Sequence, residues 1–370
     1  MSKIYTSGLT ISQNIHIRKV RRLPMKGNIL VKEGDRTKAS QPVAEADIQG
    51  IMGTVKVSSI LGINPDMTAA AMVLKEGDSV EKGDLLAKHS AFFGLLKSAC
   101  KSPYSGKIEM INPLTGSVGI RLPSTKVRLT AYLPGTVTEV SGGDTVVIEA
   151  DGALLQGIFG IGGEGFGTIT MLAGSPDAVV LPEQITGKHK GCLLVCGASI
   201  GIEVLRKAQA VGAAGLIAGA MPDTNIKAYL GRDIGVAITG DENIPMSVIL
   251  TEGFGSIPMS DKAFGLLKSC EGQEASFNGA TQIRAGVMRP EVITAAREKA
   301  GATEAPDYDL KPGRSVRITS YPYFCMTGVI TELPEEPRSI ETGAKVRIMK
   351  VRLADGRTVD IPRSNAEIIA

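Results

Sequence analysis

The chain has 370 residues, of which 43% are hydrophobic and 21% charged, and its formal net charge is +3. This length predicts two or three domains, and the composition excludes wholesale disorder. No apolar run approaches the roughly 20 residues that span a bilayer, and the N-terminal segment lacks the apolar core of a secretory signal. We therefore expect a cytoplasmic protein without membrane insertion.

Glycine is abundant and aromatic residues are scarce, with 44 Gly, no Trp and only 8 Phe. This balance favours a turn-rich β protein with aliphatic cores. The cysteines show no Cys-x-x-Cys spacing and the histidines are not at ligand spacing, so we expect buried free thiols and no metal site. The residues concerned are Cys100, Cys192, Cys196, Cys270 and Cys325, and His16, His89 and His189.

Basic residues are concentrated in the first 40 positions, which contain nine Lys and Arg but only two acidic residues, Glu33 and Asp35. A basic face of this kind can meet phosphate or an acidic partner. It is more often typical of a solvated edge strand, on which Lys and Arg block pairing with another chain. The sequence leaves both interpretations open.

Two similar segments follow, ILVKEGDRTKASQPVAEA (29–46) and MVLKEGDSVEKGDLLAKH (72–89). Each places Glu-Gly-Asp between short apolar stretches. Gly34 and Gly77 tolerate positive φ, and Asp35 and Asp78 can bond to their own backbone, so each segment predicts strand, tight turn and strand.

The second copy continues through KSPYSGKIEMI (101–111) and TGSVGIRL (115–122). Over about residues 25–125 this order resembles the barrel-sandwich hybrid fold of lipoyl and biotinyl carriers, RnfC-type subunits and large RNA polymerase subunits. The resemblance implies a modifiable lysine about eight positions before Pro103, but Leu95 stands there and Lys97 lies two residues away. We therefore expect a structural or docking version of the fold, with no cofactor.

Short strands continue over residues 126–172 and include the glycine-rich stretch GIFGIGGEGFG (157–167). A phosphate loop requires a following helix N-terminus, whereas TITMLAG is strand-like and no Gly-Lys-Ser/Thr is present. The stretch instead predicts a tight bend or a close approach between backbones.

Residues 187–277 alternate between apolar strands and amphipathic helices, which predicts a mostly parallel sheet covered by helices. In such sheets ligands bind beyond the carboxyl ends of the strands. The candidate ligand-binding residues at these ends are Ser199, Asp223, Thr239, Asp241 and Glu252. Helix caps and turns use the same residue types. No Ser/His/Asp set and no G-x-G-x-x-G is present, so no catalytic residue is assigned.

The final segment contains LKPGRSVRITSYPYFCMTGVITEL (310–333) and KVRIMKVRLADGRTVDIPRSNAEII (345–369). It resembles the KOW motif of transcription elongation factors and ribosomal proteins, which implies an SH3-like barrel and contact with RNA, the ribosome or RNA polymerase. Stacking and phosphate contact would then come from aromatic and basic residues. These candidates are Arg314, Arg317, Tyr321, Tyr323 and Phe324.

The predicted fold is therefore α+β and multidomain. It has a β-rich barrel-sandwich hybrid region over residues 1–186, which residues 278–293 can complete. A central α/β unit (187–277), a linker (294–309) and a KOW-like SH3 barrel (310–370) follow.

Three functional hypotheses remain, in order of preference. The first is a non-enzymatic binding or scaffold protein that forms a homo-oligomer. The second is a KOW-dependent factor whose partner is RNA, the ribosome or RNA polymerase. The third is an enzyme with a small-molecule site at the strand ends of the α/β unit.

Overall fold

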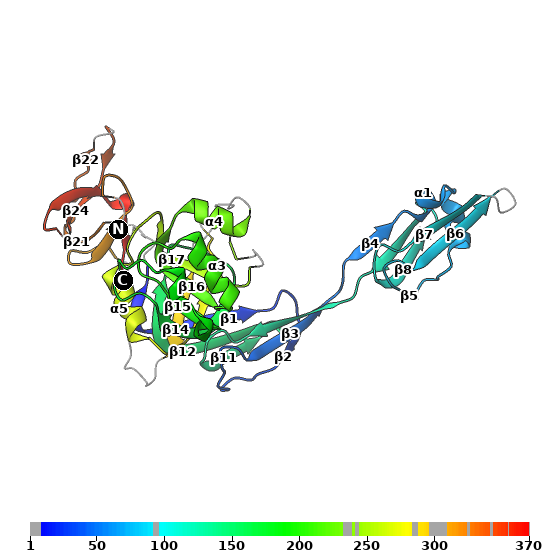
Figure 1. Ribbon diagram of the computed structural model, residues 1–370, viewed down its shortest axis with the longest axis horizontal. Helices are drawn as coiled ribbons and strands as arrows, with labels where there is room; N and C mark the ends of the chain where they lie inside the picture. Colours follow the sequence, from blue (N-terminus) through cyan, green and yellow to red (C-terminus); the bar gives the residue numbers. More distant parts are fainter. Residues whose placement is uncertain are drawn as a thin grey trace.

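The computed structural model describes residues 9–91, 96–231, 239–240, 244–282, 288–295, 309–323, 326–340, 343–353 and 355–369. The protein is mostly β, with 46% strand and 15% helix. Figure 1 shows a large body, a smaller C-terminal sheet beside it, and a third unit that stands away from the body on a narrow stalk.

One ten-stranded sheet forms the body, in the order β1-β12-β19-β18-β14-β15-β16-β17-β13, with β11 also paired to β12. The four strands from β14 to β17 pair in parallel, and all other pairs are antiparallel. The strands are β1 (Ile11–Arg22), β11 (Thr136–Ser141), β12 (Thr145–Gln156), β13 (Phe159–Ile161), β14 (Glu164–Met171), β15 (Cys192–Val195), β16 (Gly215–Met221), β17 (Ser247–Phe254), β18 (Glu274–Asn278) and β19 (Glu291–Ala295).

Three helices accompany the parallel strands: α3 (Ile202–Val211), α4 (Asp223–Leu230) and α5 (Asp261–Ser269). α3 ends at Gly212, whose φ of 80° is a conformation that glycine adopts without steric cost. α3 and α5 turn apolar faces to the main core, which also contains Leu194, Ile217 and Phe277. Two single-turn 3-10 helices, η3 (Pro182–Gln184) and η4 (Gly187–His189), precede β15.

The predicted fold class, α+β with a central parallel α/β unit, is wrong. The chain is mostly β, with a curled half-barrel sheet and few helices. The parallel strands belong to the same sheet as antiparallel neighbours, because β18 pairs with β14 and β19 pairs with both β18 and β12. Buried strands give the same apolar runs in parallel and antiparallel sheets, so the strand–helix rhythm does not identify a separate unit.

The stalk consists of β3 (Pro42–Ile48) and β10 (Thr125–Thr130), with the two-residue strand β2 (Asn28–Ile29) beside β3. β3 and β10 are antiparallel, and their last pair before the third unit is Ile48 with Thr125. The chain therefore leaves the body along β3 and returns along β10.

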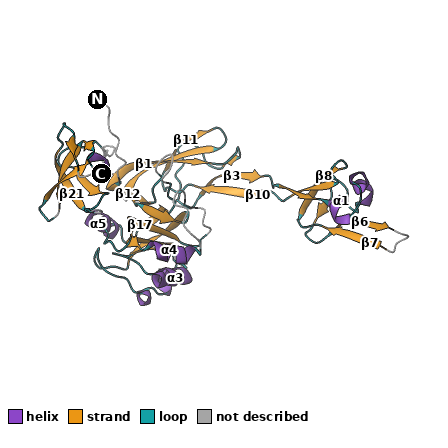
Figure 2. Cartoon of the chain, turned by 90° about the horizontal axis from the view of Figure 1, so that it is seen from above, coloured by secondary structure: helices purple, strands orange, loops and turns teal. Residues whose placement is uncertain are grey.

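The residues between these strands form the third unit, here called the tip unit (52–121), which stands apart from the body in both views (Figures 1 and 2). It has its own core, which includes Val57, Leu86, Ile108 and Ile120. Its sheets run β4-β9-β8-β5 and β6-β7. The elements are β4 (Met52–Val55), α1 (Val57–Leu61), η1 (Pro65–Met67), α2 (Thr68–Ala71), β5 (Ser79–Val80), β6 (Leu85–Ala91), β7 (Leu96–Lys101), β8 (Gly106–Asn112) and β9 (Ser117–Arg121).

The first Lys-Glu-Gly-Asp turn lies in the body and forms as predicted. Gly34 has a φ of 89°, and the Asp35 carboxylate accepts a hydrogen bond from the Lys32 amide at 2.9 Å. The turn also joins β11, because the Gly34 amide donates to the carbonyl of Val137 at 2.8 Å.

The second turn, in the tip unit, repeats this arrangement. Gly77 has a φ of 94°, the Asp78 carboxylate accepts from the Lys75 amide at 2.7 Å, and the Gly77 amide donates to Ile108 at 2.7 Å. The two similar sequence segments therefore also form similar local structures. The second turn lies in the unit inserted between β3 and β10, both of which follow the first turn in the sequence.

The C-terminal sheet has the order β25-β24-β21-β20-β26 and its own core, which includes Val316, Met349 and Ile368. β22 and β23 form a separate pair, and η5 lies between β25 and β26. The elements are β20 (Ser315–Ile318), β21 (Thr327–Glu332), β22 (Arg338–Ser339), β23 (Lys345–Val346), β24 (Ile348–Leu353), β25 (Thr358–Pro362), η5 (Arg363–Asn365) and β26 (Ala366–Ile368).

Candidate functional site

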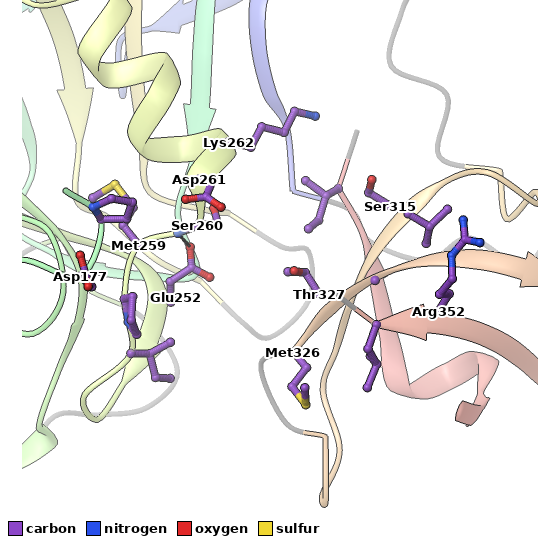
Figure 3. A pocket seen from close by; sticks show the side chains of 17 residues that line it. Asp177, Glu252, Met259, Ser260, Asp261, Lys262, Ser315, Met326, Thr327 and Arg352 are labelled. Carbon is purple, nitrogen blue, oxygen red and sulfur yellow. Dashed lines mark hydrogen bonds between the residues drawn. The ribbon is translucent and has the colours of Figure 1, made fainter. Parts of the chain in front are cut away.

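A cleft of about 830 Å³ lies where the C-terminal sheet meets the body. The body contributes the loop after β14 and the segment from the end of β17 to the start of α5, and the C-terminal sheet contributes β21 and β24. Figure 3 shows Glu252, Ser260 and Lys262 on the body side, opposite Ser315, Thr327 and Arg352. The cleft therefore lies beyond the carboxyl end of β17, a position that favours ligands in parallel sheets.

Beside the cleft, Glu252 and Arg317 form a buried ion pair. Arg317 Nη2 lies 2.6 Å from Glu252 Oε2, and the two side chains are 2% and 4% exposed. The second carboxylate oxygen accepts a hydrogen bond from the Ser260 amide at 3.0 Å, at the start of α5. Arg317 also donates to the carbonyl of Thr251 at 3.3 Å. The pair therefore ties β20 of the C-terminal sheet to β17 and α5 of the body.

Two further contacts hold this junction. Arg289 pairs with Glu367 at 3.1 Å, and the amide of Leu9 donates to the carbonyl of Ile368 at 3.0 Å. Ile369 is buried in the core of the body. The C-terminal sheet is thus packed against the body and not merely tethered to it.

The predicted ligand-binding residues do not form one site. Ser199 donates to the Gly255 carbonyl at 3.2 Å, and Asp223 accepts from the Thr224 amide at 2.8 Å in the first turn of α4. Thr239 is buried and donates to the Gly160 carbonyl at 2.8 Å. Asp241 lies outside the described residues. Of the four that the structure describes, only Glu252 lines the cleft.

The predicted nucleic-acid residues are also dispersed. Arg317 is buried in its pair with Glu252, whereas Arg314 lies half-buried in the turn before β20. Tyr321 is 87% exposed, Tyr323 packs against the core of the C-terminal sheet, and Phe324 lies outside the described residues. Burial gives Arg317 a structural role that its sequence context did not reveal.

The basic strip on β1 is engaged by acidic neighbours. Arg18 pairs with Glu139 and Glu149, Arg21 with Glu164, and Arg22 with Asp144. Glu149 lies opposite Arg18 on the neighbouring strand β12, whereas Glu139 and Glu164 come from β11 and β14 and Asp144 precedes β12. These carboxylates already supply opposite charge, which favours the edge-strand interpretation over a phosphate-binding face.

A second buried polar cluster surrounds Tyr132, which is almost fully buried with a φ of 64°. Its hydroxyl donates to Glu291 at 3.1 Å, and Lys19 approaches the same carboxylate at 2.5 and 2.7 Å. The guanidinium of Arg21 lies 5.3 Å from the ring centre and binds Glu164 through two hydrogen bonds. A non-glycine residue in this conformation is held there by its surroundings.

This cluster predicts a loss of stability at alkaline pH. Burial, followed by the negative charge of Glu291, raises the pKa of Tyr132 well above 10.0. The folded state therefore keeps the phenol proton to a higher pH than the unfolded state. The stabilisation from the buried phenol is complete below pH 10 and decreases as the pH rises above it. We expect Tyr132→Phe to flatten the fall in unfolding free energy between pH 9 and 11, measured by urea titration. An unchanged slope would contradict this assignment.

Four of the five cysteines lie in the described residues. Within the described part of the chain no group of three His, Cys, Asp or Glu residues is arranged to hold a metal ion. Cys100, Cys192, Cys196 and Cys270 are free thiols, and only Cys192 is not buried. Burial raises the pKa of Cys196 to about 12, which makes this thiol unreactive. In the same described residues, the helices are all too short or too polar to cross a bilayer.

In comparisons with known proteins, no protein family and no curated protein matches the chain.

Proposed function

We propose that the chain is a non-enzymatic scaffold protein that associates with further copies of itself through the tip unit. The observation that carries this proposal is the concentration of exposed large apolar side chains on this small unit. Exposed apolar groups gathered on one element of a protein mark interaction surfaces. Those of the tip unit are Ile60, Met67, Val73, Leu85, Met110 and Leu114.

Two of these side chains, Leu114 and Met67, lie at one end of the tip unit. The turn before β9 lies against α1 and η1, because the Ser58 amide donates to the Gly116 carbonyl at 3.0 Å. A Cβ on Gly116 would lie only 3.1 Å from the Cα of Pro65. Leu114 in this turn, 87% exposed, and Met67 at the end of η1 therefore belong to the same end of the unit.

The charge of the tip unit favours a protein partner. Residues 52–121 contain eight Lys and Arg against six Asp and Glu, so the two signs nearly balance. A surface that binds nucleic acid needs a clear basic excess, since neutralised phosphates supply most of the binding free energy. Balanced charge around apolar groups is instead typical of protein interfaces, which combine an apolar centre with a polar rim.

The stalk argues that this partner is a second copy. The body-side end of the stalk is buried, since Val43 of β3 belongs to a core shared with Ile15 and Ile17 of β1. Beyond it, both views show the tip unit away from the body (Figures 1 and 2). A partner that shelters such an arm must be present wherever the chain folds. Another copy of the chain meets that requirement, and symmetric association is the commonest form of oligomer.

Substitutions at the tip test the proposal. Burying a leucine side chain contributes about 1.5–3 kcal/mol, so we expect Leu114→Lys to weaken self-association at least about tenfold. Sedimentation velocity over a range of concentrations measures the effect. Leu181→Lys is the matched control, because Leu181 is an exposed apolar residue of the body. Equal weakening by both variants, or none by Leu114→Lys, would contradict the proposal.

A further inference from the structure

The turn that carries Leu114 is uncharged and held by its own hydrogen bonds. Its sequence is Asn-Pro-Leu-Thr-Gly-Ser (112–117), and Leu114 is 87% exposed. The side-chain oxygen of Asn112 accepts hydrogen bonds from the amides of Leu114 at 2.9 Å and Thr115 at 3.2 Å. The Gly116 amide donates to the Asn112 carbonyl at 2.9 Å. A turn fixed in this way presents its leucine with little further loss of conformational entropy on binding.

This turn lies at the far end of the arm that the stalk and the tip unit form. β9 begins at Ser117, directly after the turn, and ends at Arg121, next to the stalk. Figure 1 shows the tip unit and the C-terminal sheet at opposite ends of the molecule. Leu114 therefore does not reach the cleft beside the C-terminal sheet of its own chain, whereas Leu114 of another copy can.

The cleft between the body and the C-terminal sheet has apolar walls that suit such a turn. Ile257 and Met259 come from the segment before α5, and Val329 and Leu353 come from β21 and β24. Figure 3 shows Met259 on the body side and Met326 on the side of the C-terminal sheet. The volume of about 830 Å³ lies in the upper part of the range of binding pockets, so the cleft has room for the side chains of a turn.

The charges in the cleft favour an uncharged occupant. Asp177 and Asp261 line it together with Lys262 and Arg352, so the two signs balance, and Glu252 is neutralised in its buried ion pair. A charged segment would lose hydration in the cleft without a net opposite charge to compensate. Residues 112–117 contain no Asp, Glu, Lys or Arg. Insertion of this turn therefore buries apolar surface without burying a new charge.

We propose that the turn 112–117 of one copy inserts into the cleft of a second copy, with Leu114 between the wall of the body and that of the C-terminal sheet. This docking rests on the self-association proposed above and adds the surface that receives the tip unit. One turn is small beside the roughly 20–30 residues a side of a stable interface. Two copies that insert their turns into each other make two such contacts and form a closed, symmetric dimer.

Sedimentation velocity on variants of the full chain separates this docking from self-association by another face of the tip unit. Ile257→Lys adds a charge to the body wall of the cleft, and Val329→Lys adds one to the opposite wall. Neither side chain belongs to the cores that these two units form within the described residues, and the unfolding midpoint checks that each variant folds. We expect each to weaken self-association at least about tenfold, as Leu114→Lys does. Val20→Lys is the matched control, because Val20 is an exposed residue of β1 that does not line the cleft.

A mixture of two variants tests the insertion itself. Leu114→Lys keeps an intact cleft and Ile257→Lys keeps an intact turn, so a pair of unlike variants retains one of the two contacts. We expect a 1:1 complex in the mixture at a concentration at which each variant alone is a monomer. Association lost in Leu114→Lys but kept in Ile257→Lys and Val329→Lys would overturn the docking and leave the proposed self-association in place. Absence of the mixed complex, or equal weakening by Val20→Lys, would also overturn the docking, and unchanged association in every variant would overturn both.

Discussion

Replacing Arg317 with methionine is expected to lower the free energy of unfolding by about 3–5 kcal/mol, because it leaves the buried Glu252 carboxylate without its cation. The expected loss is large because the ion pair is buried: both side chains are at most 4% exposed, and their charged atoms lie 2.6 Å apart. Glu252→Gln should be similarly damaging, since it leaves a buried guanidinium and weakens the acceptor of the Ser260 amide.

Urea unfolding measures this loss, and two further variants identify its origin. The double variant Arg317→Met/Glu252→Met should lose much less than the sum of the single losses, because a buried pair replaced by apolar residues is often nearly neutral. Arg338→Met removes an exposed pair between β22 and Asp360 of β25 and should cost at most about 1 kcal/mol. Additive single losses would show that the pair does not act as a unit.

Phe277→Ala is expected to destabilise the body by about 3–5 kcal/mol, as deletion of a fully buried aromatic ring does. Phe277 is 0% exposed and lies in β18 within the main core. Its ring packs closely on Gly165, where a Cβ would lie 2.3 Å from Cε2, and on Gly215, where the distance would be 2.8 Å. No other side chain can replace these glycines without moving the ring.

Urea unfolding of Phe277→Ala is compared with that of Phe254→Ala as a control. Phe254 is exposed, and its ring lies 4.7 Å from that of Phe159, so its removal should cost about 0.5–1.5 kcal/mol. Gly165→Ala should also destabilise the protein, because the added methyl group collides with the ring. A smaller loss for Phe277→Ala than for Phe254→Ala would contradict this account of the core.

Local turn chemistry was predictable from the sequence, whereas strand pairing was not. The Gly34 and Gly77 turns form as predicted, because positive φ and Asp-to-backbone bonds depend on adjacent residues. The glycine-rich stretch at 157–167 is a region of close approach between backbones. A Cβ added to Gly160 would lie only 2.5 Å from the carbonyl oxygen of Gly279. The order of the ten strands depends on contacts across more than a hundred residues, which no local pattern encodes.

The candidate site shows the same division. Glu252 lines the cleft near the end of β17. The sequence assigned Glu252 and Arg317 to two different functions, although they bind each other. The cleft itself was not predicted, since its lining comes from segments as distant in the sequence as α5 and β24. The resemblance of residues 310–370 to KOW modules, and contact with RNA, stay predictions.

Self-association through the tip unit is tested most directly by light scattering on the purified chain and on a variant without the tip. Joining Ile48 to Thr125, which are paired in the stalk, through Asn-Gly gives a two-residue hairpin that keeps the register of β3 and β10. We predict that the full chain has the mass of an oligomer in low and high salt, with no RNA present, and that the tipless variant is a monomer. A monomeric full chain, or a tipless variant that keeps the oligomeric mass, would contradict the proposal. A mass that increases only with added RNA, and only at low salt, would favour the nucleic-acid alternative instead.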